Sequence, residues 1–193
     1  MNIGVLALQG DFGEHIVMLE RMGLKGVEVR LPDQLASLDG LIIPGGESTT
    51  IGKLAEAYHL IKPLCQFGSQ KAIWGTCAGA IMLSKDVHRR QPLLGLMDIT
   101  IERNAFGRQV ASFETELYIP ALDKVGPSSL PYHAIFIRAP LIESVGGDAR
   151  ILAKLPDGRI VAAEQGRLLA TSFHPELTTD DRFHRYFVSL ING

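Results

Sequence analysis

Short apolar runs alternate with amphipathic segments along the first half of the chain. Compact apolar runs predict buried strands, and apolar positions three or four residues apart predict helices. The predicted strands are residues 3–8, 26–31, 38–43 and 72–74, and the predicted helices are residues 11–22, 49–58, 61–68 and 80–83. On the helix at 11–22, the expected buried face is Ile16, Leu19 and Met22. Such alternation favours a parallel sheet, because each crossover helix returns the chain to start a strand in the same direction.

The pattern changes after Leu96, where shorter apolar runs predict strands at residues 98–103, 114–119, 134–138, 151–156 and 159–164. The segment 155–159, Leu-Pro-Asp-Gly-Arg, predicts a hairpin. A further strand at 168–173 precedes a closing helix at 182–190, with Phe183, Phe187 and Leu190 facing inward. We therefore expect an α/β protein in one domain of residues 1–193. Its fold should be a flavodoxin-like three-layer arrangement, with a mixed, mostly parallel central sheet and an antiparallel extension.

Composition narrows the function classes. The chain has 193 residues, is 46% hydrophobic and carries a formal net charge of −2. It has no long run of one charge sign, so we expect no nucleic-acid partner. No apolar stretch is long enough for a bilayer, and the N-terminal run is typical of a first strand rather than a signal peptide. Cys65 and Cys77 do not make a disulfide framework, which favours a cytoplasmic protein with reduced thiols. No ligand spacing is typical of a metal site, and we expect no cofactor.

The segment Gly75-Thr76-Cys77-Ala78-Gly79 joins an apolar strand to an apolar helix. A nucleophile at the tip of such a turn sits in a strained backbone, and small neighbours let the chain pass close by. The start of a helix favours a thiolate on Cys77, and the N–H of Ala78 points to where an oxyanion forms. The alternative is that Cys77 is a small buried hydrophobe.

A second segment, Ser172-Phe173-His174-Pro175-Glu176, follows a predicted strand near the other end of the chain. Pro175 biases His174 towards an extended conformation, in which residues i and i+2 point to the same side. Glu176 can then accept a hydrogen bond from one ring nitrogen of His174 and leave the other for Cys77. This predicts a Cys-His-Glu triad. The alternative is a surface turn.

The loop Pro44-Gly45-Gly46-Glu47-Ser48-Thr49-Thr50 follows a predicted buried strand. Ligands bind at the carboxyl ends of strands in open α/β sheets, and two glycines allow the backbone to approach a ligand. The loop therefore fits a second oxyanion donor facing Cys77. In the plainer interpretation, it is a connection in which Ser48 or Thr49 caps a helix.

Together these segments resemble the triad (class I) glutamine amidotransferases. Further segments narrow the resemblance to the glutaminase subunits of pyridoxal 5′-phosphate synthase, the PdxT family: Leu8-Gln9-Gly10-Asp11, the run 102–109 from Glu102 to Gln109, Phe136-Ile137-Arg138-Ala139-Pro140, and the continuation Leu177-Thr178. The match covers nearly the whole chain. The connection at 125–133 looks longer than is usual in that family, which affects only local loop geometry.

The resemblance implies that the chain hydrolyses glutamine and passes ammonia to a (β/α)₈ synthase subunit, in a large hetero-oligomer. It implies that Cys77 is the nucleophile, His174 the acid/base and Glu176 its orienting partner. It also implies oxyanion donors at Gly46 and Ala78. The residues that it implies contact glutamine are Gly46, Glu47, Ser48, Arg103, Ile137 and Arg138. A planar Arg fork suits the substrate's carboxylate, although Arg103 and Arg138 could equally form ordinary ion pairs.

Two alternative functions come from other classes. One is a stand-alone cysteine hydrolase or peptidase of similar fold, and the other is a catalytically silent regulatory module. The remaining histidines, at 15, 59, 88 and 184, have no acid partner at ligand spacing, and His133 is a weak competitor for the base. Cys65, between Leu64 and Phe67, is expected in the core.

Overall fold

The computed structural model describes residues 1–103, 112–127 and 129–193. Its central feature is a run of parallel strands in the order β2-β1-β3-β4-β12. This is the strand order of a flavodoxin-like sheet. These strands are β1 (Asn2–Leu6), β2 (Lys25–Val29), β3 (Gly40–Ile43), β4 (Ala72–Thr76) and β12 (Leu168–Thr171).

The sheet continues beyond β12 in antiparallel fashion through β11, β9 and β6, and ends with β5, which runs parallel to β6. A further strand, β10, pairs with β11 through the predicted hairpin, and β7 and β8 form a separate antiparallel sheet. The expected mixed sheet with an antiparallel extension is confirmed. The bounds are β5 (Ser84–Asp86), β6 (Met97–Glu102), β7 (Ser112–Leu117), β8 (Tyr132–Ile137), β9 (Leu141–Val145), β10 (Arg150–Lys154) and β11 (Ile160–Gln165).

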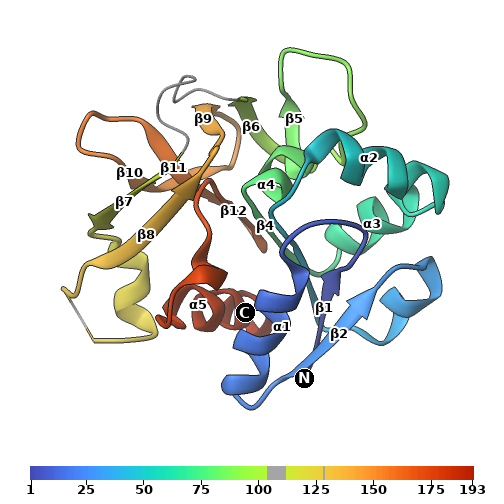
Figure 1. Cartoon of the computed structure of the whole chain (residues 1–193), viewed down its shortest axis with the longest axis horizontal. Helices are drawn as coiled ribbons and strands as arrows, with labels where there is room; N and C mark the ends of the chain where they lie inside the picture. The colour runs from blue at the N-terminus through green and yellow to red at the C-terminus, as the bar shows by residue number, and fades with distance from the viewer. Residues whose placement is uncertain (104–111, 128) are drawn as a thin grey trace.

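Helices cover both faces of the sheet (Figure 1). On one face, α1 (Phe12–Arg21) and α5 (Arg182–Asn192) bury a cluster that includes Leu19, Trp74 and Phe187. On the other face, α2 (Ser48–Ala57), α3 (Ile61–Gly68) and α4 (Ala78–Leu83) bury Ile43, Ile51 and Leu64. Short 3₁₀ turns lie at η1 (Pro32–Ser37), η2 (Pro120–Lys124) and η3 (Pro175–Leu177). The three layers are those expected.

The structure differs from the sequence prediction in several local features. Strands β5 and β9 and the three 3₁₀ turns were not predicted. Strand β5 and the turns are too short or irregular to show a period, and the adjacent polar residues Glu143 and Ser144 interrupt the apolar pattern of β9. On α1 the buried side chains are His15, Met18 and Leu19, whereas Ile16 and Met22 are only half-buried. The predicted buried face of this helix was therefore partly wrong. The observed face is rotated slightly about the helix axis, which brings His15 into the interior. The part of the 102–109 motif at 104–109, including Arg108, and Ser128 in the 125–133 connection lie outside the described residues.

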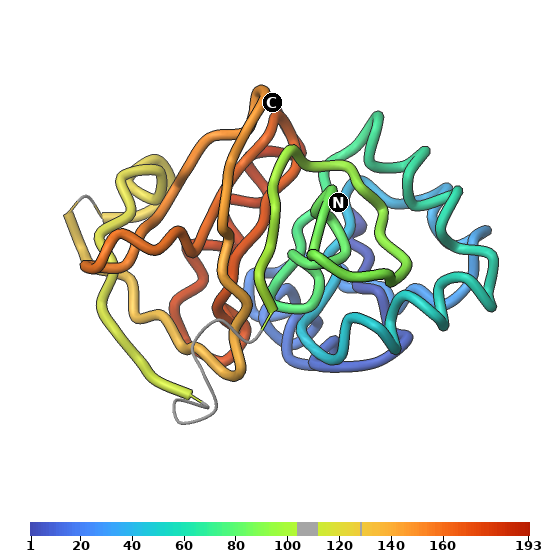
Figure 2. The backbone as a smooth tube through the Cα atoms, turned by 90° about the horizontal axis from the view of Figure 1, so that it is seen from above, coloured from blue at the N-terminus to red at the C-terminus, as the bar shows by residue number. Residues whose placement is uncertain are grey.

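The pairing of β4 with β12 joins the two halves of the chain. In Figure 2 residues 1–103 lie on one side of the molecule, and most of the chain after residue 112 lies on the other. In this pairing Thr76 is opposite Thr171, and the N–H of Cys77 donates to the carbonyl oxygen of Thr171 at 2.8 Å. The residues that follow both strands, 77 onward and 172 onward, therefore emerge at the same edge of the sheet.

Gly75 and Gly79 let the backbone pass closely on both sides of Cys77. A Cβ atom on Gly75 would lie 2.4 Å from the Gly79 carbonyl carbon, and one on Gly79 would lie 1.9 Å from the carbonyl oxygen of Ile43. Both contacts are with backbone, which cannot move without shifting β3 or α4. These two glycines are required by close approach rather than by a positive φ.

We expect Gly79→Ala to destabilise the fold by about 2 kcal/mol or more, because it forces β3 and α4 apart. Gly13→Ala is the matched control, since a Cβ at Gly13 in α1 has no neighbour within 4 Å, and should leave stability unchanged or raise it by up to about 1 kcal/mol, because alanine favours the helix. Urea unfolding of the three proteins measures both effects. Equal stability of Gly79→Ala and the parent would contradict the close approach.

Candidate active site

Cys77 sits at the junction of β4 and α4 in a strained conformation, with φ 49° and ψ −102°. This lies in the left-handed half of backbone space, which non-glycine residues rarely occupy and which is common at functional sites. The side chain is buried, with 7% of the residue exposed. The N–H of Ala78 is the first of α4, and such N–H groups have no partner within the helix. A thiol thus lies next to an N–H group that has no acceptor within its own helix.

His174 and Glu176 form a buried hydrogen-bonded pair, with 2.6 Å between His174 Nδ1 and Glu176 Oε1. The backbone N–H of His174 donates to the carbonyl oxygen of Ile135 on β8 at 2.9 Å, which anchors the segment. The two residues are brought together by the 3₁₀ turn that begins at Pro175, rather than by the extended chain expected from the sequence. His174 Nε2 is buried and has no hydrogen-bonded partner among the described residues, so it is the ring atom left for Cys77.

The His174 ring is held in its charged form. Burial disfavours that charge, but interactions with Cys77 and Glu176 outweigh burial and raise the pKa of His174 to about 10. Burial raises the pKa of Glu176, and His174 opposes that rise. The raised pKa of His174 is therefore the effect of its two partners, whereas the raised pKa of Glu176 is the effect of burial.

A cavity of about 440 Å³ opens beside Cys77 at this edge of the sheet. Of the residues that the sequence assigned to substrate, Gly46, Glu47, Ser48, Arg103 and Arg138 line it, whereas Ile137 does not and is 41% exposed. Arg138 has φ 45°, a second strained backbone at the same cavity. The full lining is Gln9, Gly46, Glu47, Ser48, Cys77, Ala78, Ile81, Arg103, Arg138 and Pro140.

Glu47 organises the wall of this cavity. Its carboxylate caps α2, accepting from the N–H groups of Thr49 at 3.1 Å and Thr50 at 2.7 Å. The expectation that Ser48 or Thr49 caps this helix was wrong, because the longer Glu47 side chain reaches the same N–H groups. Burial raises the pKa of Glu47, but the hydrogen bonds from Thr50 and Thr49 outweigh it and lower the pKa to about 2. The ionised carboxylate also accepts from Arg103 Nη2 at 2.9 Å.

Sequence reasoning missed two glutamines, Gln9 in the lining of the cavity and Gln91 in contact with Arg103. Gln9 Oε1 accepts from the N–H of Glu47 at 2.7 Å, and Gln91 Oε1 accepts from Arg103 Nη1 at 2.8 Å. Gln9 lies in the motif 8–11 and follows β1, so its position beside the β3 loop could have been inferred from strand order. Nothing in the sequence around Gln91 signals its contact with Arg103.

The remaining candidates lie elsewhere. His133 pairs with Glu114 at 2.8 Å and Glu116 at 2.7 Å on the exposed face of the β7–β8 sheet, so it is no competitor for the base. Cys65 is half-buried, its thiol donates to the carbonyl oxygen of Leu94 at 3.4 Å, and burial raises the pKa of that thiol.

Asp11, His174 and Glu176 present ligand-type atoms within 4.8 Å of one another, a grouping that the sequence did not reveal. The hydrogen bond between His174 Nδ1 and Glu176 occupies the ring nitrogen that faces the carboxylates. We therefore assign this group to proton transfer rather than to a metal.

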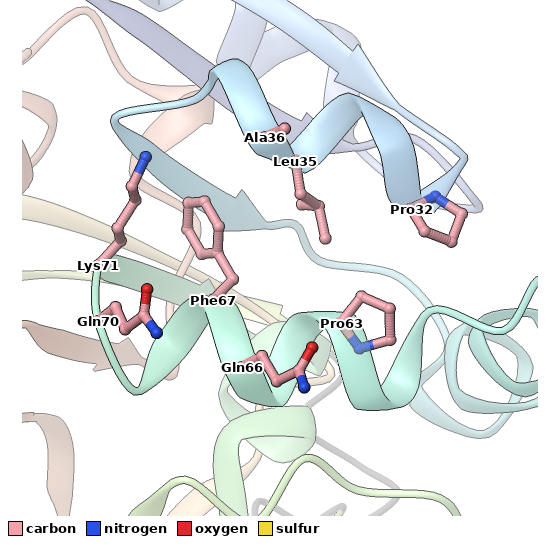
Figure 3. A pocket seen from close by; sticks show the side chains of 8 residues that line it. All are labelled: Pro32, Leu35, Ala36, Pro63, Gln66, Phe67, Gln70 and Lys71. Atoms are coloured by element: carbon pink, nitrogen blue, oxygen red, sulfur yellow. The ribbon is translucent and has the colours of Figure 1, made fainter.

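A second cavity, of about 420 Å³, lies between η1 and α3 (Figure 3). The ammonium of Lys71 there donates to the carbonyl oxygen of Leu38. The lining offers no nucleophile, acid or base paired for chemistry: Pro32, Leu35, Ala36, Pro63, Gln66, Phe67, Gln70 and Lys71. The cavity beside Cys77 is thus the better candidate for an active site.

Comparison with known proteins decides the family. A profile of the SNO glutamine amidotransferase family matches residues 5–192. The chain belongs to that family. It is 56% identical to a protein of Herpetosiphon aurantiacus over 98% of this chain and 100% of the other, and 54% identical to one of Chloroflexus aggregans with the same coverage. Both relatives are named pyridoxal 5′-phosphate synthase subunit PdxT.

Comparison with solved structures is consistent with this family and fold. A chain described as a glutamine amidotransferase superposes with a TM-score of 0.91 and 47% identity, covering 99% of both chains. A chain of the PurLQS structure from Thermotoga maritima has a TM-score of 0.73 at 16% identity, covering 99% of this chain and 97% of that one, which shows a shared fold alone. No described helix combines the length and apolar character needed to cross a bilayer.

We expect the His174 ring to titrate near pH 10. Because this pKa lies above the ordinary value of 6.5, the ion pair stabilises the fold fully below about pH 6.5 and loses that contribution as pH rises through about 10. Cys77→Ala should lower the midpoint by about one pH unit or more, since it removes one of the two partners. NMR titration of the His174 ring measures both values. A parent midpoint near 6.5 would contradict the stabilisation of the charged ring by Cys77 and Glu176.

Proposed function

We propose that the chain hydrolyses L-glutamine to L-glutamate and ammonia, and supplies the ammonia to the synthase subunit of pyridoxal 5′-phosphate synthase in vitamin B6 biosynthesis. The observation that carries the proposal is the placement of Cys77 at a cavity lined by Arg103 and Arg138, with the buried His174–Glu176 pair beside it. Relatives that carry the PdxT name match 98% of the chain at 52–56% identity.

In the first half-reaction, the Cys77 thiolate attacks the side-chain amide carbon of glutamine. The carbonyl π electrons move onto oxygen, and the N–H of Ala78 together with N–H groups around Gly46 stabilise that oxyanion. When the oxyanion collapses, the C–N bond breaks and His174 gives its proton to the leaving nitrogen. Ammonia departs, and the glutamyl group remains on Cys77 as a thioester.

In the second half-reaction, neutral His174 removes a proton from water, which attacks the thioester carbonyl. The C–S bond breaks, glutamate leaves, and the Cys77 thiolate again faces a protonated His174. Glu176 accepts the Nδ1–H throughout, which orients the ring and stabilises its charge. Every proton and electron pair is accounted for by groups of this chain and water, so no step needs a cofactor.

Substrate recognition is assigned to the walls of the cavity. The guanidinium groups of Arg103 and Arg138 suit the α-carboxylate of glutamine. Glu47 supplies negative charge for the α-ammonium group, and Ser48 lies at the same wall. Ile137 lies on β8 immediately before Arg138, and its contact with glutamine is assigned to its backbone.

The partner is proposed to be a (β/α)₈ synthase subunit, assembled with this chain into a large hetero-oligomer in the cytoplasm, where Cys77 stays reduced. We treat residues 1–193 as one glutamine amidotransferase domain, of which the family profile covers 5–192. A stand-alone peptidase is disfavoured because Glu47, Arg103 and Arg138 line the cavity, and such charges suit the free α-groups of an amino acid better than the neutral backbone of a peptide. A silent regulatory module is disfavoured because nucleophile, base and orienting carboxylate all meet at the site.

The test measures glutamate production by the parent and two variants, each with and without the synthase. The synthase should raise the parent's kcat by about 10²-fold or more, the size expected when one oxyanion donor is gained. We assign this gain to the peptide at Gly46, which would turn its N–H towards the oxyanion when the synthase binds. Gly46 has φ +150°, and glycine allows that peptide to reorient at low steric cost. Cys77→Ala should lose more than about 10⁴-fold in kcat in both conditions.

Cys65→Ala is the matched control, because it removes the other thiol without touching the cavity, and it should retain parental kcat and KM. A Cys77→Ala protein that still releases ammonia at the parental rate would refute the nucleophile. Equal parental activity with and without the synthase would refute the gating at Gly46 and leave the hydrolysis itself standing.

A further inference from the structure

Two histidines that the mechanism above does not use, His15 and His184, are completely buried behind the triad. They come from α1 and α5 and contact each other on one face of the sheet. The edge of Trp74 packs against both rings, with centroids 5.5 Å from His15 and 4.8 Å from His184. Burial lowers the pKa of both residues, that of His184 to about 3. Both rings are therefore neutral, with one N–H each.

These rings form a chain of contacts that ends at the triad. His184 Nε2 lies 3.0 Å from His15 Nδ1, and His15 Nε2 lies 3.3 Å from Thr76 Oγ1. The same Nε2 lies 3.4 Å from Glu176 Oε2, the carboxylate oxygen that does not bond His174 and that is buried without a hydrogen-bond partner among the described residues. His15 thus stands between a hydroxyl of β4, one residue before Cys77, and the outer oxygen of Glu176.

The contacts select one tautomer. If His15 carried its proton on Nδ1, the lone pair of its unprotonated Nε2 would face the lone pairs of the Glu176 carboxylate, and the two atoms would repel each other. His184 would then have to carry its proton on Nδ1, where it has no partner among the described residues. A buried N–H without an acceptor is costly. With the proton on Nε2 of both rings, His184 donates to His15, and His15 donates to Thr76 with Glu176 Oε2 next to the same N–H. The ring nitrogen left without a partner is then His184 Nδ1, which carries no proton and needs no acceptor.

We propose that His15 is a positioning residue of the triad: its Nε2–H, which bonds Thr76, is the donor nearest to the otherwise unpartnered outer oxygen of Glu176, and His184 fixes that tautomer. The role rests on the proposed function, because it acts on the reaction only through Glu176. The neutral donor favours the ionised form of the carboxylate and restrains its rotation, so that Oε1 stays aimed at His174.

The other groups around Glu176 do not duplicate this contact. His174 approaches from the same turn and bonds Oε1. Asp11, from the loop after β1, lies 3.7 Å from His174 Nδ1 and carries the same charge as Glu176. Tyr132 on β8 points its hydroxyl to Thr178, 3.5 Å away. Apart from His174, His15 is the basic residue in contact with Glu176 in the described part of the chain.

The experiment measures kcat and KM for glutamine against pH, in the presence of the synthase, for the parent, His15→Phe and His15→Gln. His15→Phe keeps a ring against Trp74 but removes the donor. It should lower kcat by about 10-fold or more and leave KM unchanged, because His15 does not line the cavity. The acid limb of the kcat/KM profile should move to higher pH, because Glu176 becomes easier to protonate without the donor. His15→Gln places an amide N–H near the Nε2 position and should restore the acid limb.

Tyr186→Phe is the matched control, because it removes a buried hydroxyl from the same helix as His184. That hydroxyl donates to Glu164 and does not contact Glu176, so the acid limb should not move. An unchanged acid limb in folded His15→Phe, or equal shifts in the Phe and Gln variants, would overturn the proposal. Absence of glutamine hydrolysis by the parent would instead overturn the proposed function.

A measurement on the unmodified protein keeps the proposal testable whatever the variants' stability. The ¹⁵N chemical shifts of the imidazole nitrogens distinguish the two neutral tautomers. We expect His15 and His184 to be protonated on Nε2 at neutral pH. Protonation of His15 on Nδ1 would overturn the assignment, since the ring could not then donate towards Glu176.

Discussion

The active site depends on the parallel pairing of β4 with β12. These strands lie far apart in the sequence, and their register places Thr76 beside Thr171. The N–H of Cys77 is committed to the carbonyl oxygen of Thr171, so the turn that carries the thiol is tied to the strand that leads to His174. A slip in this register would separate the nucleophile from its base, because each residue along a strand advances about 3.3 Å. The positive φ of Cys77 persists because this hydrogen bond and the packing of Gly75 and Gly79 hold it.

A second constraint joins the loops after β1 and β3. The N–H of Asp11 donates to the carbonyl oxygen of Gly45, and a Cβ on Gly10 would lie 1.8 Å from that oxygen. The loops therefore meet backbone to backbone at the switch point of the sheet, where ligands bind in this fold. Glu47 then serves both as the cap of α2 and as the partner of Arg103. Helix stability and the shape of the cavity are thus coupled through one carboxylate.

The sequence carried enough information for the strand–helix alternation, the turn at Cys77 and the pairing of His174 with Glu176, because each has a local pattern. Other features arise only when distant segments meet. Glu47 displaced Ser48 as the cap because a longer side chain competes for the same N–H groups. Gln91 reaches Arg103 across a loop, and His15 meets Glu176 only because α1 is rotated from its predicted face. The burial of His184 among Trp74 and Phe183 depends on tertiary packing, which a helical pattern cannot distinguish from an ordinary core.

The central claim is that Cys77 is a reactive thiol facing a cavity shaped for glutamine. Its most direct test is incubation with a diazoketone analogue of glutamine, followed by peptide mass spectrometry. The account predicts one adduct, on Cys77, whose formation is slowed by excess glutamine, and no adduct on Cys65. Modification of Cys65 instead, or modification of Cys77 at a rate that glutamine does not change, would contradict it.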